Sequence, residues 1–155
     1  MSVTADNASP PLRFTGKALI FNGKTLKFSY PAVSGKQGRY NPIPAGTYWI
    51  ATDEVYENGP TTDYLTKVTL AVTTFSTLDT IEQRHSAAWG RFRIPIHQSA
   101  AQQLRTGRSG MFIHGGTVPG SAGCIDLTEW IDVFVDHLRT EYVGVGRSVV
   151  PLIVE

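Results

Sequence analysis

The most informative stretch of the chain is residues 112–127, which read FIHGGTVPGSAGCIDL. Residues 111–113 are apolar and predict a short strand that leads into His114. Residues 115–123 are rich in glycine, serine and proline, which is typical of a loop. Cys124, the only cysteine of the chain, follows this loop and comes just before a predicted helix. The stretch therefore has an imidazole and a thiol at the two ends of one glycine-rich loop.

Such a pair can form a cysteine nucleophile and its base. A thiolate rather than a thiol attacks a carbonyl carbon, so Cys124 needs a base within hydrogen-bond reach, and His114 is the candidate. The start of a helix just after Cys124 also favours negative charge there. The N–H groups of Gly123 and Cys124 are candidate donors to a developing oxyanion. Taken singly, a lone cysteine is most often a small buried apolar residue. The pairing with His114 in this loop favours catalysis.

Outward from this stretch, the chain predicts mainly strands. An Asn-Gly pair at residues 22–23 is typical of a hairpin turn and lies between predicted strands at 13–21 and 26–30. Further strands are expected at 47–50, 68–72, 92–96 and 149–154. Because the last of these contains Pro151, we expect it at a sheet edge.

Helices are fewer. Residues 127–142 predict one substantial helix with an apolar stripe, and Thr128 is its predicted N-cap. A shorter helix is expected at 99–105, between an N-cap at Ser99 and a stop at Gly107. The predicted fold class is therefore mainly β, with one substantial C-terminal helix and one or two short helices.

The domain organisation is simple. Residues 1–11 are polar, end in two prolines, and predict a flexible N-terminal tail. Residues 12–155 predict a single domain, in which residues 76–88 are a further candidate for a short helix. No repeat, low-complexity segment or linker interrupts this range.

Composition excludes several classes of function. The 155 residues include 14 Lys and Arg against 13 Asp and Glu. A net charge near +1 predicts no bulk attraction to nucleic acid or to an anionic membrane. No apolar run approaches the roughly 18 residues of a spanning helix, so no membrane span is expected. A single cysteine excludes an internal disulfide and a four-cysteine zinc site, and no histidine-rich ligand motif is present. We therefore expect no metal and no cofactor.

The stretch around Cys124 resembles the active-site motif of the L,D-transpeptidase (YkuD-type) family. It is most similar to the small branch of type VI secretion effectors, in which a histidine, a short spacer and Ser-x-Gly-Cys-Ile follow one another. Three upstream segments agree in order. Residues 21–26 resemble the opening hairpin of that branch, residues 30–35 its next motif, and residues 43–50 the Pro-x-Gly-x-Tyr-x-Ile strand of the wider family. The likeness covers about residues 14–128.

The resemblance implies an L,D-transpeptidase-like β-sandwich or barrel that acts on the peptide stems of peptidoglycan. Cys124 would attack the carbonyl of the third stem residue and release the following D-residue, leaving a thioester. An amine acceptor then gives a cross-link or an exchanged D-amino acid, and water makes the enzyme an L,D-carboxypeptidase. His114 would act as base and then as acid, oriented by the carbonyl of Gly115. Ser121 would shape the loop, and Gly123 with Cys124 would supply the oxyanion donors.

Two positions depart from the family pattern. Ala122 stands where the wider family has histidine, and the effector branch tolerates this. Asp126 stands where the wider family often has arginine, so the residue that would recognise a substrate carboxylate is open. Each arginine elsewhere is more often a solvated surface charge. The candidate replacements are Arg91, Arg93, Arg105 and Arg108, and Gly116 and Ala122 are further candidates for substrate contact.

Two other interpretations remain at this point. Papain-like and NlpC/P60-like peptidases have the cysteine first and the histidine well downstream. Here the only histidine after Cys124 is His137, which lies in the predicted helix, so chain order argues against them. A non-catalytic cell-wall binding module of the same fold is left open by Asp126.

Location and partners follow from the implied substrate. Residues 1–10 contain neither a basic region nor an apolar core, so no secretory signal is visible. Peptidoglycan nevertheless lies outside the cytoplasm. The effector resemblance implies delivery by a type VI system into the periplasm of a target cell. It also implies a cognate immunity protein that blocks the cleft, besides the stem peptides themselves.

Overall fold

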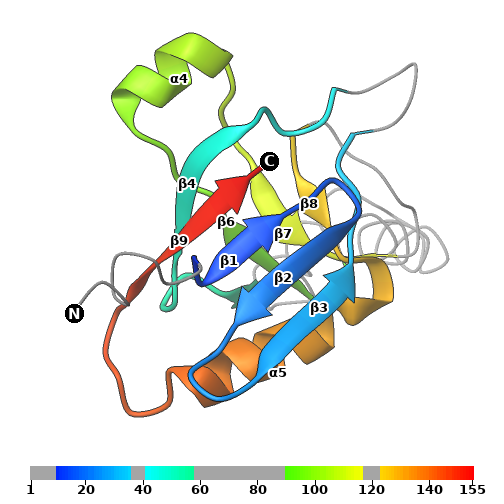
Figure 1. Ribbon diagram of the computed structural model, residues 1–155, viewed down its shortest axis with the longest axis vertical. Coiled ribbons are helices and arrows are strands. Elements are labelled where there is room, and N and C mark those ends of the chain that lie inside the picture. Colours follow the sequence, from blue (N-terminus) through cyan, green and yellow to red (C-terminus); the bar gives the residue numbers. More distant parts are fainter. Residues whose placement is uncertain (1–9, 36–40, 58–89, 117–122) are drawn as a thin grey trace, which may run out of the picture.

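The computed structural model describes four segments of the chain, residues 10–35, 41–57, 90–116 and 123–155. Within them the chain forms two sheets, two α-helices and a short 3₁₀ turn (Figure 1). The strand predicted at 68–72, the helix predicted within 76–88 and most of the predicted N-terminal tail lie outside these segments.

The larger sheet has five strands in the order β3-β2-β1-β9-β4. Their bounds are Lys27–Pro31, Ala18–Asn22, Leu12–Phe14, Val149–Val154 and Gly46–Ala51. Neighbouring strands are antiparallel except β1 and β9, which are parallel. One row of paired residues crosses the four strands from β2 to β4, and each of its side chains is 0 % exposed: Phe21, Leu12, Leu152 and Tyr48.

The smaller sheet has four strands in the order β5-β6-β7-β8. Their bounds are Tyr56–Glu57, Phe92–Pro95, Phe112–His114 and Ile125–Asp126. The first two pairings are antiparallel, and β7 and β8 are parallel. Ile94, Ile113 and Ile125 form a buried row on one face of this sheet.

Two isolated bridges join the sheets. Val33, just beyond β3, pairs with Asp126 of β8, and Trp49 of β4 pairs with His97, just beyond β6. Strands β3 and β6 both end at a proline, which has no N–H to donate to a neighbouring strand. Val33 and His97 therefore form single bridges beyond the ends of these strands and do not extend them. The described residues therefore contain no closed barrel, and the barrel form of the predicted fold is wrong for them. The fold is mixed α/β and mostly sheet, which confirms the β-rich expectation.

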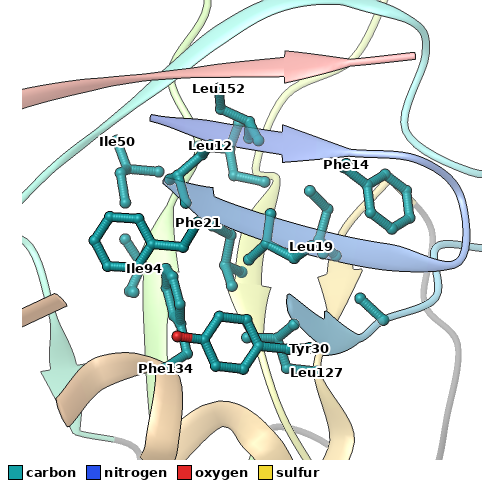
Figure 2. Close-up of a cluster of buried hydrophobic side chains, with 14 of the residues drawn as sticks. Leu12, Phe14, Leu19, Phe21, Tyr30, Ile50, Ile94, Leu127, Phe134 and Leu152 are labelled. Carbon is teal, nitrogen blue, oxygen red and sulfur yellow. The ribbon is translucent and has the colours of Figure 1, made fainter. Parts of the chain in front are cut away.

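The hydrophobic core lies between the two sheets and helix α5, residues Ile131–Glu141. Figure 2 shows Leu12 and Phe21 of the larger sheet gathered with Ile94 of the smaller sheet and Phe134 of α5. Full burial of such side chains contributes about 1.5–3 kcal/mol each. The smaller sheet thus packs its apolar face against the core, and its other face carries polar side chains.

The short helix α4 spans Ala100–Thr106 as the capping signals predict. Ser99 Oγ accepts from the Gln102 N–H at 3.1 Å, and Gly107 ends the helix at φ +67°. Neither α4 nor α5 is long and apolar enough to cross a membrane. The start of α5 differs from the prediction. A 3₁₀ turn at Thr128–Trp130 precedes it, and Thr128 is not an N-cap but a residue with φ +52°.

The position of Pro151 also differs from the prediction, because β9 lies inside the larger sheet between β1 and β4. Trp49, the partner of Pro151 on β4, exchanges both of its backbone hydrogen bonds with His97 on the other side. Pro151 therefore needs no N–H toward β4. On the β1 side the pairing begins only at Leu152, so no hydrogen bond to β1 is lost because Pro151 lacks an N–H.

The hairpin at Asn22-Gly23 is confirmed, with a longer turn than expected. The single strand predicted at 13–21 is wrong, because the chain turns at residues 15–17 and forms two antiparallel strands, β1 and β2. Strands β2 and β3 pair from Ala18 with Pro31 to Asn22 with Lys27, so residues 23–26 form the loop. The Gly23 N–H donates to the Leu26 carbonyl at 2.8 Å and closes the turn.

Candidate functional site

The register of β7 and β8 brings His114 and Cys124 onto one face of the smaller sheet. Ile113 pairs with Ile125, and His114 pairs with Asp126. Side chains alternate between the faces of a strand. Because Ile113 and Ile125 face the core, His114 and Asp126 face the other way. Continuing the register back by one residue places Cys124 beside Phe112, two positions from Asp126 on that same face.

His114 and Cys124 are therefore diagonal neighbours on adjacent strands. Diagonal pairs of this kind are within reach of long side chains. His114 is 1 % exposed and Cys124 is 3 % exposed, so both groups lie in a largely water-excluded setting. The sequence separates the two residues by a loop, and the register of the sheet places them on adjacent strands.

A backbone carbonyl orients the imidazole of His114. Its Nδ1 lies 2.8 Å from the carbonyl oxygen of Gly115. A carbonyl oxygen can only accept, so Nδ1 carries the proton in this contact. The lone pair of the neutral ring is then on Nε2, which is the atom that can act as a base. The Gly115 carbonyl therefore contacts the imidazole, and its catalytic role stays a prediction.

The turn that follows His114 is packed too tightly for any side chain. A Cβ on Gly115 would lie 2.4 Å from the Thr128 carbonyl oxygen and 2.4 Å from Ile131 Cγ2. The Gly116 N–H donates to that same carbonyl at 3.2 Å. Thr128 directs its carbonyl there from a left-handed backbone conformation, φ +52°, which is strained for a β-branched residue. These contacts fix the turn that carries the Gly115 carbonyl and compensate for the strain at Thr128.

Gly90 carries no sequence signal of a functional site, yet it completes this packing. A Cβ on Gly90 would lie 2.7 Å from Gly116 N and 2.8 Å from the Gly115 carbonyl carbon. Its own φ of +70° also favours glycine. Its only local signal is a glycine directly before a predicted strand, which is too common to identify a site.

The backbone of Gly123 is used differently from the prediction. Its φ is +72°, and its N–H donates to the carbonyl of Asn41 at 3.1 Å. This amide is therefore already hydrogen-bonded and does not fit the predicted role of oxyanion donor. The prediction for the Cys124 amide is unaffected. Asn41 has no sequence signal that links it to the loop, because the contact is set only by the tertiary fold.

Asp126 is a buried carboxylate in the strand position next to His114. It is 0 % exposed, and its Oδ1 accepts from the Thr128 N–H at 2.8 Å. Its backbone exchanges hydrogen bonds with Val33, at 2.8 and 3.0 Å. Asp126 therefore caps the turn that supports Gly115 and Gly116, and it is not placed as an exposed substrate contact.

The four candidate arginines fall into two groups, and two of them lie at the site. Arg93 of β6 pairs in register with His114, so the two residues share a face. The Arg93 Cζ lies 5.7 Å from the ring centroid of Phe112, the neighbour of Cys124. The guanidinium of Arg108 borders Gly123, because its Nη1 would lie 3.1 Å from a Cβ built there.

The other two arginines lie elsewhere. Arg91 stacks on the ring of Phe92, with its Cζ 5.1 Å from the ring centroid, and Arg139 contacts the same ring at the same distance. It lines a cavity of about 400 Å³ beside α5. Arg105 hydrogen-bonds to Gln102 within α4.

Two further predicted contacts, Ser121 and Ala122, lie outside the described residues. Gly116 is described and belongs to the packed turn after His114. Within the four described segments, no group of three or more His, Cys, Asp or Glu side chains could hold a metal ion.

Comparisons with known proteins extend only to the fold. No family model matches the chain, and no curated protein matches it. Among solved structures, the chain is similar to Bd1075 of Bdellovibrio bacteriovorus, with a TM-score of 0.51 and 15 % sequence identity. The match covers 96 % of this chain and 49 % of the other, so the chain spans about half the length of that protein. At this identity the likeness is evidence of a shared fold and of nothing more.

Proposed function

We propose that the protein is a cysteine acyl-transfer enzyme of peptidoglycan, an L,D-transpeptidase or L,D-carboxypeptidase of the YkuD type. One observation carries the proposal. His114 and Cys124 share a face of adjacent strands, and the Gly115 carbonyl holds Nδ1 of His114 at 2.8 Å. The motif resemblance supplies the substrate class, and the sheet register supplies the pairing of base and nucleophile that such a reaction needs.

In the proposed reaction, Nε2 of His114 takes the proton of the Cys124 thiol. The thiolate adds to the carbonyl carbon of the third stem residue, and the Cys124 N–H faces the oxyanion. The intermediate collapses with cleavage of the C–N bond, and the leaving amine of the D-residue takes the proton from Nε2. Water or an amine, deprotonated by His114, then attacks the thioester and frees the thiol.

The decisive experiment is mass spectrometry of purified muropeptides incubated with the protein. Loss of one terminal D-residue identifies a carboxypeptidase, a replaced terminal residue identifies exchange, and a dimer identifies cross-linking. We expect Cys124→Ala and His114→Gln to reduce turnover by at least about 100-fold, the lower end of the usual contribution of general base catalysis. An acyl adduct of 1:1 stoichiometry should be trapped on Cys124 in the wild type.

The chain offers a matched control histidine. His97 lies outside the site and binds Glu54, with Nε2 2.7 Å from Oε1. His97→Gln should therefore keep turnover near the wild-type rate. The proposal fails if wild-type protein leaves every muropeptide unchanged and a thiol reagent labels Cys124 no faster than free cysteine.

A second candidate is a non-catalytic binding module of the same fold. The buried Asp126, at a position where the family often has arginine, is the observation that favours it. The same samples separate the two functions. A binding module retains muropeptides on the protein without changing their mass, and Cys124→Ala leaves that retention intact.

Location and partner are part of the same proposal. An enzyme that acts on peptidoglycan must reach the periplasm, and the effector resemblance supports delivery by a type VI system and neutralisation by an immunity protein. Expression of the chain fused to a periplasmic signal should then lyse or deform cells, while the Cys124→Ala variant should not. Equal toxicity of the two proteins would contradict this part.

A further inference from the structure

Arg93 contains a buried polar atom without a partner. Its Nε has essentially no solvent exposure, and no hydrogen-bond acceptor among the described residues contacts it. The same residues provide no carboxylate within ion-pair distance of its guanidinium, which instead lies over the Phe112 ring, with Cζ 5.7 Å from the ring centroid. A buried donor without an acceptor is rare in folded proteins and calls for an explanation, such as a ligand.

The location of Arg93 suggests what the ligand is. Arg93 pairs in register with His114 and shares the face that carries Cys124. Its guanidinium leans over Phe112, which the register places beside Cys124. The cation therefore lies over the strand position adjacent to the nucleophile, where the substrate atoms next to the scissile bond must pass.

Arg108 brings a second guanidinium to the residue that precedes the nucleophile. Its backbone is fixed at both ends of the residue: the Arg108 N–H donates to Thr106 Oγ1 at 3.2 Å, and its carbonyl accepts from Gln98 Nε2 at 2.6 Å. The side chain then reaches Gly123, directly before Cys124. The nearby carboxylate of Asp126 is buried and engaged by the Thr128 N–H, so it does not compete as an exposed acceptor.

We propose that Arg93, assisted by Arg108, binds the C-terminal carboxylate of the D-residue that leaves. The planar guanidinium of arginine matches a carboxylate bidentately. The site then selects stems that end one residue after the scissile bond, because only these present a free carboxylate next to it. This inference rests on the proposed function and adds to it the chain terminus that the site recognises.

The test compares two donor peptides with two proteins. The donors are a tetrapeptide stem with a free C-terminal carboxylate and the same stem with a C-terminal amide. For wild type, we expect amidation to lower kcat/KM by about 10- to 100-fold, the effect of losing a hydrogen bond to a charged group. Arg93→Gln should lower kcat/KM on the acid by a similar factor and should show almost no further loss on the amide.

Two other variants protect this result against a folding artefact. Arg93→Lys keeps a positive charge and the aliphatic stem over Phe112, so it should fold and recover part of the preference for the acid. Arg139→Gln removes a matched arginine that also stacks on a phenylalanine ring, 5.1 Å from Phe92, and should retain the wild-type preference. Thermal melting of each variant checks that the protein is folded.

The outcomes separate the inference from the function on which it depends. If wild type turns over neither donor and traps no acyl adduct, the proposed function fails. If wild type is active but Arg93→Gln discriminates between acid and amide as strongly as wild type, the function stands and the assignment of Arg93 is wrong. An equal loss on both donors would also overturn it, since that pattern indicates a structural role.

Discussion

The two sheets of this protein differ in what they bury. In the larger sheet, the outer face carries Arg13, Ile20 and Ile153 in register, and each of these is only partly buried. In the smaller sheet, the outer face carries Arg93, His114 and Asp126 in register, and the last two are 1 % and 0 % exposed. Apart from tyrosine and cysteine, the buried polar side chains in the described residues are Gln102, His114 and Asp126, and the last two lie side by side on β7 and β8.

This difference separates stability from chemistry. Burial of a polar group costs free energy unless it is fully hydrogen-bonded, whereas burial of an apolar row is favourable without further conditions. A strand pair that served only the core would have no physical need for an imidazole and a carboxylate on its second face. We therefore assign stability mainly to the larger sheet, and the proposed function would place catalysis on the outer face of the smaller one.

The largest expected effect on stability comes from Leu152→Ala in the larger sheet. Leu152 is 0 % exposed and pairs with Leu12 and Tyr48, so its removal leaves a cavity at the centre of the core. We expect the free energy of unfolding to fall by about 2–5 kcal/mol, measured by urea denaturation. Turnover per folded molecule should stay within about twofold of wild type if the assignment above holds.

Val149→Ala is the control in the same strand, since Val149 is 58 % exposed. It should change the free energy of unfolding by no more than about 0.5 kcal/mol. A tenfold loss of turnover in folded Leu152→Ala would show that the two sheets are not separable in this way.

For Gly115→Ala we expect a smaller loss of stability than for Leu152→Ala and a larger loss of turnover. The new Cβ would overlap the Thr128 carbonyl and Ile131, both at 2.4 Å, and one of these atoms is backbone. We expect a cost of about 1–3 kcal/mol from overpacking. Turnover should fall by about 100-fold, because the carbonyl that holds Nδ1 of His114 is displaced.

Gly107→Ala separates this steric effect from backbone strain. Gly107 has φ +67° and open space around its Cα, so alanine there should cost about 1–2 kcal/mol of stability and leave turnover unchanged. If Gly115→Ala retains full turnover, the Gly115 carbonyl does not orient His114.

The smallest effect concerns a polar group of the larger sheet, Tyr30 of β3. It is 3 % exposed, and its hydroxyl lies 2.6 Å from Nδ1 of His137 on α5. Burial raises the pKa of Tyr30 well above the usual 10.0. Loss of this hydrogen bond in Tyr30→Phe should cost about 1 kcal/mol at neutral pH and leave turnover unchanged.

The pH dependence has a definite sign. Because the folded state holds the phenol protonated, this contribution to stability is complete below pH 10 and declines as the pH rises through 10, where the unfolded chain ionises first. Burial raises the pKa of Tyr142 as well, so part of the alkaline decline belongs to that residue. Urea denaturation from pH 7 to 11 should show a shallower decline in Tyr30→Phe than in wild type. Tyr56→Phe, at an exposed position, should follow wild type, and identical slopes in all three proteins would contradict this prediction.

Local signals in the sequence predicted the elements whose cause is local. The Asn-Gly pair at 22–23 marked the first hairpin, and Ser99 and Gly107 marked the two ends of α4. Predictions failed where a distant segment overrides the local preference. Thr128 is a good N-cap by type, but packing against Gly115 and Gly116 holds it in a left-handed conformation. Pro151 predicts an edge strand, but the pairing of β9 with β1 begins only at the next residue, so the N–H that proline lacks is not needed there.

The sequence by itself determined which reactive groups are present: one thiol, an imidazole ahead of it in the chain, and a loop rich in small residues between them. The tertiary structure alone decided how these groups are arranged. It set Arg93 opposite His114, used the Gly123 amide for Asn41, and turned the Asp126 carboxylate inward to Thr128. The physical reason is that register and packing join residues far apart in the chain, and periodicity and residue preference describe only near neighbours.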